Sequence, residues 1–240
     1  AGSIQANYTA NCIYQGNITV TSTNSSAISF GANGGTATMT GGSSQSLNKS
    51  GSASNPTIPK LVLNKSANHL TLNVPLTVSS SLTLTSGKLI LVANDLTLGS
   101  SSTVSGGNAS SYVMTNSTGV IKRVVAATGQ FFPIGNSAYN PATLQNSGTS
   151  DTYSLRVIDN VTNDGTGIGT TTSKAVVNRT WMISEAVAGG SNVSLTLNWN
   201  SGEGINAFSA ASAFMAHYIS ASSKWQNIGG TVSSGYITTT

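Results

Sequence analysis

The sequence predicts an all-β protein: a short parallel β-solenoid, or β-helix-like domain, followed by an antiparallel β-sandwich. Three observations predict this fold. Apolar and polar residues alternate through much of the chain, the alternation returns about every 20 residues in the first half, and the runs become longer and more aromatic in the second half. We place a solenoid with irregular N-terminal coils at residues 1–108 and an Ig-like or jelly-roll-like sandwich at 109–240.

The solenoid prediction rests on residues 61–99, where apolar runs begin at 61, 70, 76, 82, 89 and 96. Every third start gives the pairs 61 and 82, 70 and 89, and 76 and 96, which lie 21, 19 and 20 residues apart. Three short sides then make one coil, and each coil pairs in parallel with the next. Antiparallel hairpins are the alternative interpretation, but the Asn-Gly and Asp-Gly pairs typical of two-residue hairpins are absent from this segment.

The second half predicts an antiparallel sandwich because its longer runs are separated by turn-rich segments and contain all three Trp. The nine runs span 111–114, 119–125, 130–135, 152–159, 175–183, 192–200, 213–219, 223–228 and 235–239. Residues 209–219 also have the composition of a helix. Because strands are expected on both sides, we interpret them as a buried strand that includes His217.

The composition excludes several classes of protein. Only 7% of residues are charged, while 39 Ser and 31 Thr supply a hydroxyl-rich surface. The net charge of +4 is scattered, whereas nucleic-acid binding needs a clustered basic stripe. Cys12 is the only cysteine, so an intrachain disulfide is excluded, and we expect a small buried apolar residue there. No apolar run approaches the roughly 18 residues of a membrane span, and the start at Ala-Gly-Ser is expected for a processed protein or a fragment.

Catalytic chemistry is not expected, and neither is a cofactor. The chain has two histidines, His69 and His217, and no G-x-S-x-G motif to hold a nucleophilic serine. Glycoside hydrolysis needs two facing carboxylates, yet Asp95 is the only acid of the predicted solenoid. The sequence therefore predicts a protein that is not an enzyme.

Three kinds of weaker candidate site are present. Asp159, Asn163 and Asp164 could offer oxygen ligands to calcium, although a loop held by its own Asx turns explains them as well, so we expect no metal. Tyr139, Trp199 and Trp225 are candidates for stacking on sugars, with packing as the alternative. Ten N-x-[ST] sequons are candidate glycosylation sites: Asn7, Asn17, Asn24, Asn48, Asn64, Asn108, Asn116, Asn160, Asn178 and Asn192.

Three stretches carry a family resemblance: "GVIKRVVAATGQFFPIGNSAYNPATL" (119–144), "NRTWMISEAVAGGSNVSLTLNWN" (178–200) and "AHYISASSKWQNIGG" (216–230). They resemble a module of large secreted Bacteroidota proteins that often follows solenoid repeats like residues 59–99 and precedes the sorting domain of the type IX secretion system. The resemblance covers roughly residues 56–240 and implies an adhesin-like or matrix protein, exported to the outer cell surface or released, with no catalytic residues. It also implies one further strand after "GYITTT".

Together these features predict a non-catalytic, extracellular structural or adhesive protein. A sandwich lacking a strand invites one from another chain, so we expect a homopolymeric filament built by strand addition or coil stacking, with residues 1–23 as the candidate donor. A fragment of a longer surface protein is the alternative. The expected partners are other copies, other surface proteins or glycans. A carbohydrate-binding module is the alternative function, and a polysaccharide-degrading enzyme is the third.

Overall fold

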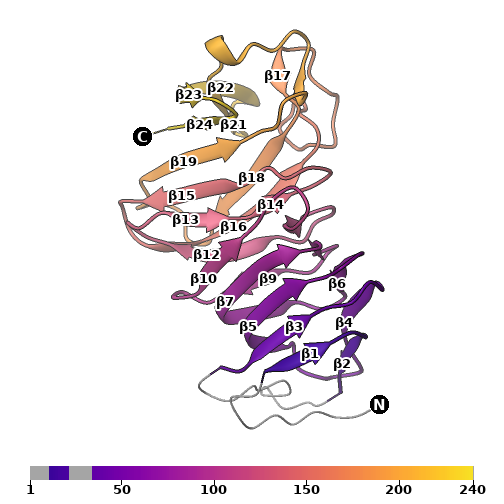
Figure 1. Ribbon diagram of the computed structural model, residues 1–240. Helices are drawn as coiled ribbons and strands as arrows, with labels where there is room; N and C mark the ends of the chain where they lie inside the picture. Colours follow the sequence, from indigo (N-terminus) through magenta and orange to yellow (C-terminus); the bar gives the residue numbers. More distant parts are fainter. Residues whose placement is uncertain (1–10, 22–33, 240) are drawn as a thin grey trace. The chain divides into compact units, whose positions relative to one another are not determined.

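The computed structural model describes residues 11–21 and 34–239, and the chain divides into two compact units between Val124 and Val125. The first unit is a parallel solenoid and the second consists of antiparallel sheets (Figure 1), which confirms the predicted all-β fold. The only helical segment among the described residues is a 3₁₀ turn at Ala210–Ser212. No helix in the described part of the chain is long and apolar enough to span a membrane.

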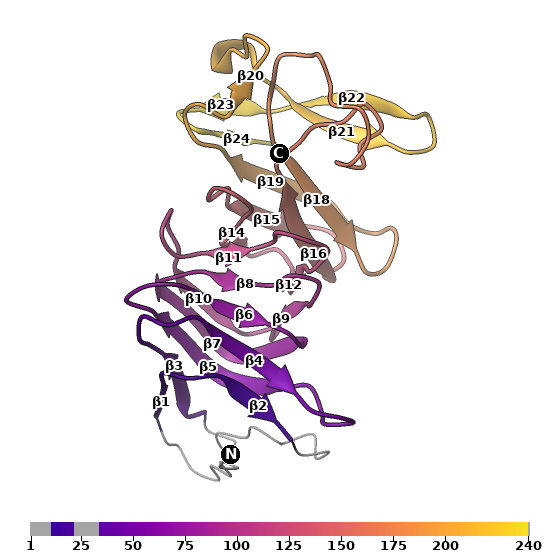
Figure 2. The same ribbon diagram turned by 90° about the vertical axis from the view of Figure 1, so that its right-hand side faces the viewer.

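Two parallel sheets form the solenoid (Figure 2). The first runs in the order β1-β3-β5-β7-β9-β12, with β10 beside β7, and comprises Cys12–Tyr14 (β1), Thr36–Met39 (β3), Thr57–Asn64 (β5), Leu76–Ser86 (β7), Leu96–Leu98 (β9), Thr103–Gly106 (β10) and Ile121–Val125 (β12). The second runs β11-β8-β6-β4-β2 and comprises Ile18–Val20 (β2), Gln45–Lys49 (β4), Leu70–Leu72 (β6), Leu89–Ile90 (β8) and Val113–Met114 (β11).

The strand register reproduces the spacing expected from the sequence. Leu61 pairs with Leu82, Leu70 with Leu89, and Leu76 with Leu96, so the repeat of about 20 residues is confirmed. The runs that begin at 76 and 82 belong to one strand, β7, because the three serines between them keep the backbone extended. Parallel pairing continues beyond residue 108, since β11 pairs with β8 and β12 pairs with β9.

Inward-facing apolar side chains form continuous columns through the solenoid. One column joins Cys12, Ala37, Leu61, Leu82 and Val104 through successive parallel pairs. Its two leucines are fully buried, and burial of each such side chain contributes about 1.5–3 kcal/mol. Cys12 is half-buried and free, and it lies at the N-terminal end of this column.

A buried lysine joins successive coils at one corner of the solenoid. Lys65 is 2% exposed, and its ammonium donates to the Thr40 carbonyl (3.0 Å), the Ser43 carbonyl (2.7 Å) and Gln45 Oε1 (2.6 Å). Gln45 Nε2 in turn donates to the Tyr14 carbonyl of the preceding coil at 3.0 Å. Burial lowers the pKa of the Lys65 ammonium, while its three oxygen acceptors favour the charged form. This lysine is a structural residue of the stack.

The second unit is antiparallel. Its five-stranded sheet runs β13-β15-β19-β24-β23, a second ladder pairs β16 with β18, and two small sheets pair β17 with β20 and β21 with β22. The strands are Gln130–Phe132 (β13), Ile134–Gly135 (β14), Ala142–Asn146 (β15), Asp151–Ile158 (β16), Val176–Val177 (β17), Thr180–Glu185 (β18), Val193–Asn198 (β19), Gly204–Ile205 (β20), Met215–Ile219 (β21), Lys224–Gly229 (β22), Thr231–Ser233 (β23) and Tyr236–Thr238 (β24).

The segment 209–219 differs from its prediction. It contains the 3₁₀ turn and β21, which pairs only with β22 among the described residues, and only Met215 is buried. His217 is exposed rather than part of a core. The expected strand is present at Met215–Ile219, but its expected burial is wrong, because Ser and Ala supply too little apolar surface and the hairpin is held by Tyr218. The ring of Tyr218 packs on Trp225 with centroids 5.4 Å apart and covers Gly165.

Candidate functional site

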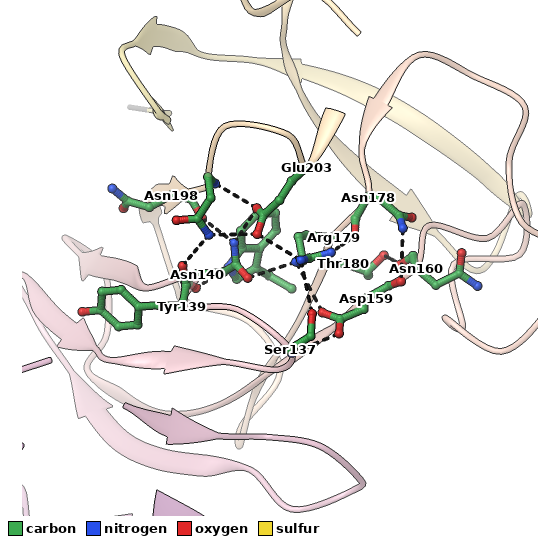
Figure 3. Close-up of polar contacts among 12 residues, drawn as sticks. Ser137, Tyr139, Asn140, Asp159, Asn160, Asn178, Arg179, Thr180, Asn198 and Glu203 are labelled. Atoms are coloured by element: carbon green, nitrogen blue, oxygen red, sulfur yellow. Dashed lines mark hydrogen bonds and ion pairs between the residues drawn. The ribbon is translucent and has the colours of Figure 1, made fainter. Parts of the chain in front are cut away.

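A buried polar cluster around Arg179 is the most extensive arrangement of charged side chains in the second unit (Figure 3). The guanidinium donates through Nε to Asn140 Oδ1 at 3.0 Å and through Nη2 to Glu203 Oε1 at 2.9 Å. Arg179 and Glu203 have side chains only 9% and 8% exposed, and Asn140 is fully buried. A charge pair so removed from water needs all its hydrogen bonds satisfied.

The carboxylate of Glu203 has donors on both oxygens. Oε2 accepts from Asn140 Nδ2 at 2.7 Å and from the Asn200 backbone N–H at 2.9 Å, while Oε1 accepts from Asn200 Nδ2 at 2.8 Å as well as from Arg179. These contacts connect the loop before β15, the residue before β18 and the loop after β19. The lone pairs that a catalytic carboxylate would present to a substrate are used for positioning.

Asp159 lies on the other side of the same guanidinium (Figure 3). Its Oδ1 is 3.3 Å from Arg179 Nε, an ion pair without hydrogen-bond geometry, because that N–H points to Asn140. Its Oδ2 accepts from the Ser137 backbone N–H at 3.0 Å. The cluster therefore holds Arg179, and with it the first residue of β18, from both sides.

The strand held in this way, β18, has a free edge. It pairs with β16 in a regular antiparallel register from Ile158–Thr180 to Tyr153–Glu185, and the Ala186 N–H donates to the Thr152 carbonyl at 3.0 Å. Since hydrogen-bonded and non-hydrogen-bonded pairs alternate, the backbone groups of the odd-numbered residues of β18 point away from β16. Among the described residues, none bonds to the backbone N–H or C=O of Trp181, Ile183 or Glu185.

Apolar side chains of β18 lie half-buried beside this edge. Trp181 pairs across the strands with Val157, and Ile183 pairs with Leu155. The side chains of Trp181 and Ile183 therefore lie on the same face of the ladder as Val157 and Leu155, which are fully buried. Burial decreases from β16 to β18 along this face. The Trp181 indole N–H donates to the Asn140 carbonyl at 3.1 Å, which fixes the ring beside the edge. We define the free backbone edge of β18 together with Trp181 and Ile183 as the β18 edge.

Both acidic calcium candidates have partners for their carboxylates. Asp159 forms an ion pair with Arg179 and accepts a hydrogen bond from the Ser137 N–H. Asp164 Oδ1 accepts from the Thr166 N–H and hydroxyl at 3.1 and 2.9 Å. A hydrogen bond from the Thr162 side chain, followed by those from Thr166, lowers the pKa of Asp164. The Asn163 N–H donates to the Thr170 carbonyl. Within residues 11–21 and 34–239 there is no group of three or more His, Cys, Asp or Glu that could hold a metal ion.

The three sugar-stacking candidates are all half-buried. Trp199 packs edge-to-face on Phe208, with centroids 6.1 Å apart, and the indole N–H of Trp225 donates to the Thr162 carbonyl at 2.9 Å. Burial raises the pKa of Tyr139 to about 12. Tyr139 extends away from the polar cluster in Figure 3.

The sequon asparagines that the structure describes fall into an exposed group and a half-buried group. Asn7 and Asn24 lie outside the described residues. The exposed sequon asparagines are Asn17, Asn64, Asn108, Asn116 and Asn192. Asn48, Asn160 and Asn178 are half-buried, and their amide nitrogens donate to backbone carbonyls. The exposed five are therefore the more accessible positions for a glycan.

The polar cluster and the β18 edge were not predicted from the sequence. Asn140 and Glu203 lie 39 and 24 residues from Arg179, so no local motif joins them. One signal was available: in a chain with 7% charged residues, an arginine immediately before a strand is unusual enough to require partners. Comparison with protein-family models, with curated proteins and with solved structures finds no match to this chain.

Proposed function

We propose that this protein is a non-catalytic, extracellular structural or adhesive surface protein that assembles with other copies of itself. The observation that carries the proposal is the β18 edge, where backbone groups with no partner among residues 11–21 and 34–239 lie beside half-buried apolar side chains. Such edges pair readily with strands of other chains. The solenoid adds an outer surface that is rich in Ser, Thr and Asn and carries few charged side chains.

The engagement of the carboxylates supports a structural role. Besides Glu203 and Asp159, Asp95 forms an ion pair of 2.7 Å with Lys122, and Asp151 Oδ2 accepts from the Val187 N–H at 2.8 Å. Glu185 Oε1 accepts from the Gly189 N–H at 3.1 Å. With Asp164, all six acids of the sequence serve local structure.

The likeness of residues 56–240 to surface modules of the Bacteroidota supports the extracellular location and export by the type IX secretion system. A hydroxyl- and amide-rich surface suits close lateral contact and hydrogen bonding to glycans. Glycosylation would fall on the exposed sequons. Sugar binding as the main function has no separate support, since Trp199 packs on Phe208 and the indole of Trp225 is bonded to the Thr162 carbonyl.

The test is the assembly state of the purified chain, measured by size-exclusion chromatography with light scattering and by electron microscopy over a wide concentration range. We expect species larger than the monomer that increase with concentration, and fibres or chains in the images. A monomer at every concentration would contradict self-assembly. A glycan array measured in parallel separates the alternative, because binding by a strictly monomeric chain would favour a carbohydrate-binding module.

A further inference from the structure

We propose that the β18 edge takes up residues 3–10 of a second copy as an added strand. The inference rests on the proposed self-assembly and specifies the two surfaces that form the joint. Two features of the chain point to this pairing: the unprotected character of the β18 edge and the alternating sequence of the N-terminal segment.

The β18 edge lacks most of the devices that normally protect edge strands, and its one charged residue, Glu185, stands at its last position. Natural edges carry Lys, Pro or a bulge, or are very short. β18 has six residues, "TWMISE", without Lys or Pro, and its ladder with β16 has no register shift. By contrast, the edge strands of the five-stranded sheet, β13 and β23, have three residues each, and Pro133 follows β13 directly. The β18 edge is therefore a better acceptor than either edge of the five-stranded sheet.

The N-terminal segment has the pattern of a strand with one apolar face. Ile4, Ala6, Tyr8 and Ala10 alternate with Ser3, Gln5, Asn7 and Thr9. Residues 3–10 contain no charge, Pro or Gly, so nothing in them opposes strand pairing. Eight extended residues span about 26 Å, enough to cover the roughly 20 Å of a six-residue strand. Their apolar face would cover Trp181 and Ile183, and the polar face would remain in water.

The attachment points favour a second copy over the same chain. The segment is attached at β1, and the second unit is attached after β12, five inter-strand steps away in the order β1-β3-β5-β7-β9-β12. At about 4.8 Å a step these attachment points are about 24 Å apart. Residues 3–10 of the same chain would need most of their extended length of about 26 Å to pass along the solenoid. Residues 3–10 of a second copy have no such restriction.

The proposal is tested by disulfide trapping between two full-length proteins in a Cys12→Ala background. One partner carries Ile183→Cys, and the other carries Ile4→Cys, Ala6→Cys or Tyr8→Cys in turn, so that each register of the donor is covered. Asn7→Cys is the matched control, because its side chain lies on the opposite face of the same strand. We expect a covalent heterodimer with at least one of the three donors and its loss with Asn7→Cys. Equal yields from all four donors would overturn the inference.

A second set of variants keeps the test decisive if Ile183→Cys does not fold. Removal of residues 1–10 should abolish assembly, and so should Ile183→Pro, which deletes an outward N–H and leaves the β16 ladder intact. Val232→Pro is the control. Val232 occupies the equivalent outward position on β23, because the pairs on either side of it, Thr231–Thr238 and Ser233–Tyr236, join β23 to β24. Assembly that survives removal of residues 1–10 would overturn the inference while leaving the proposed function standing. A wild-type chain that never assembles would overturn both.

Discussion

Arg179 ties the start of β18 to three neighbouring segments of the second unit. Its guanidinium is bound by Asn140 and Glu203 and paired with Asp159, and each partner belongs to a different loop. Because the pair with Glu203 is buried, its removal leaves a charge without compensation rather than merely deleting one contact. Arg179 thus acts on the β18 edge through position and not through direct contact with a ligand.

We predict that Arg179→Met destabilises the second unit by about 3–5 kcal/mol, since Glu203 would remain buried without its cation. The measurement is urea unfolding followed by Trp fluorescence. Lys174→Met is the control, because Lys174 is exposed, and a surface substitution of this kind changes stability by less than about 0.5 kcal/mol. The double variant Arg179→Met/Glu203→Met should lose less than the single variant. Equal losses for Arg179→Met and Lys174→Met would show that the cluster is not structural.

The strands of the solenoid depend on close approach between successive coils. Gly99, after β9, has its N–H bonded to the Val78 carbonyl, and a Cβ placed on it would overlap the backbone carbonyl oxygen of Ser79. Since that atom belongs to the backbone, the overlap cannot be relieved by turning a side chain. Gly16, in the first coil, has open space where a Cβ would lie.

Gly99→Ala is therefore expected to destabilise the solenoid by about 1–3 kcal/mol, the cost of inserting one carbon into a filled site. Gly16→Ala should change stability by less than about 1 kcal/mol, in either direction. Thermal unfolding monitored by far-UV circular dichroism compares the two variants. If both variants have the melting temperature of the wild type, the coils are not packed as closely at Gly99 as the structure shows.

The sequence predicted elements whose contacts recur at a regular spacing, and it missed those that have few apolar residues or depend on residues far apart in the sequence. The pairs Leu61–Leu82 and Leu70–Leu89 followed from spacing alone, because a stacked coil repeats the same local pattern. β15 was missed because "ATLQN" has only two apolar residues, although one of its two partners, β13, is close in sequence. The Arg179 cluster was missed because Asp159, Glu203 and Asn140 lie 20, 24 and 39 residues from Arg179 in sequence, so no local pattern joins them.

The whole molecule combines a stack of coils with a unit that carries an unprotected sheet edge. The solenoid buries leucine columns and exposes Ser, Thr and Asn, so its outer faces are soluble with little charge. The proposed joint adds a strand to the second unit and draws it from the segment before β1. Each copy would then offer one donor and one acceptor, which is the arrangement of a head-to-tail chain.

Hydrogen–deuterium exchange of the β18 backbone amides, at low and high protein concentration, tests this account most directly. The N–H groups of Trp181, Ile183 and Glu185 point away from β16 and are unpaired within the described part of the chain, so they should exchange rapidly in dilute solution. At high concentration we predict that they become protected, while the amides of Met182 and Ser184, which bond to β16, change little. Fast exchange of Trp181, Ile183 and Glu185 at both concentrations would contradict assembly through the β18 edge.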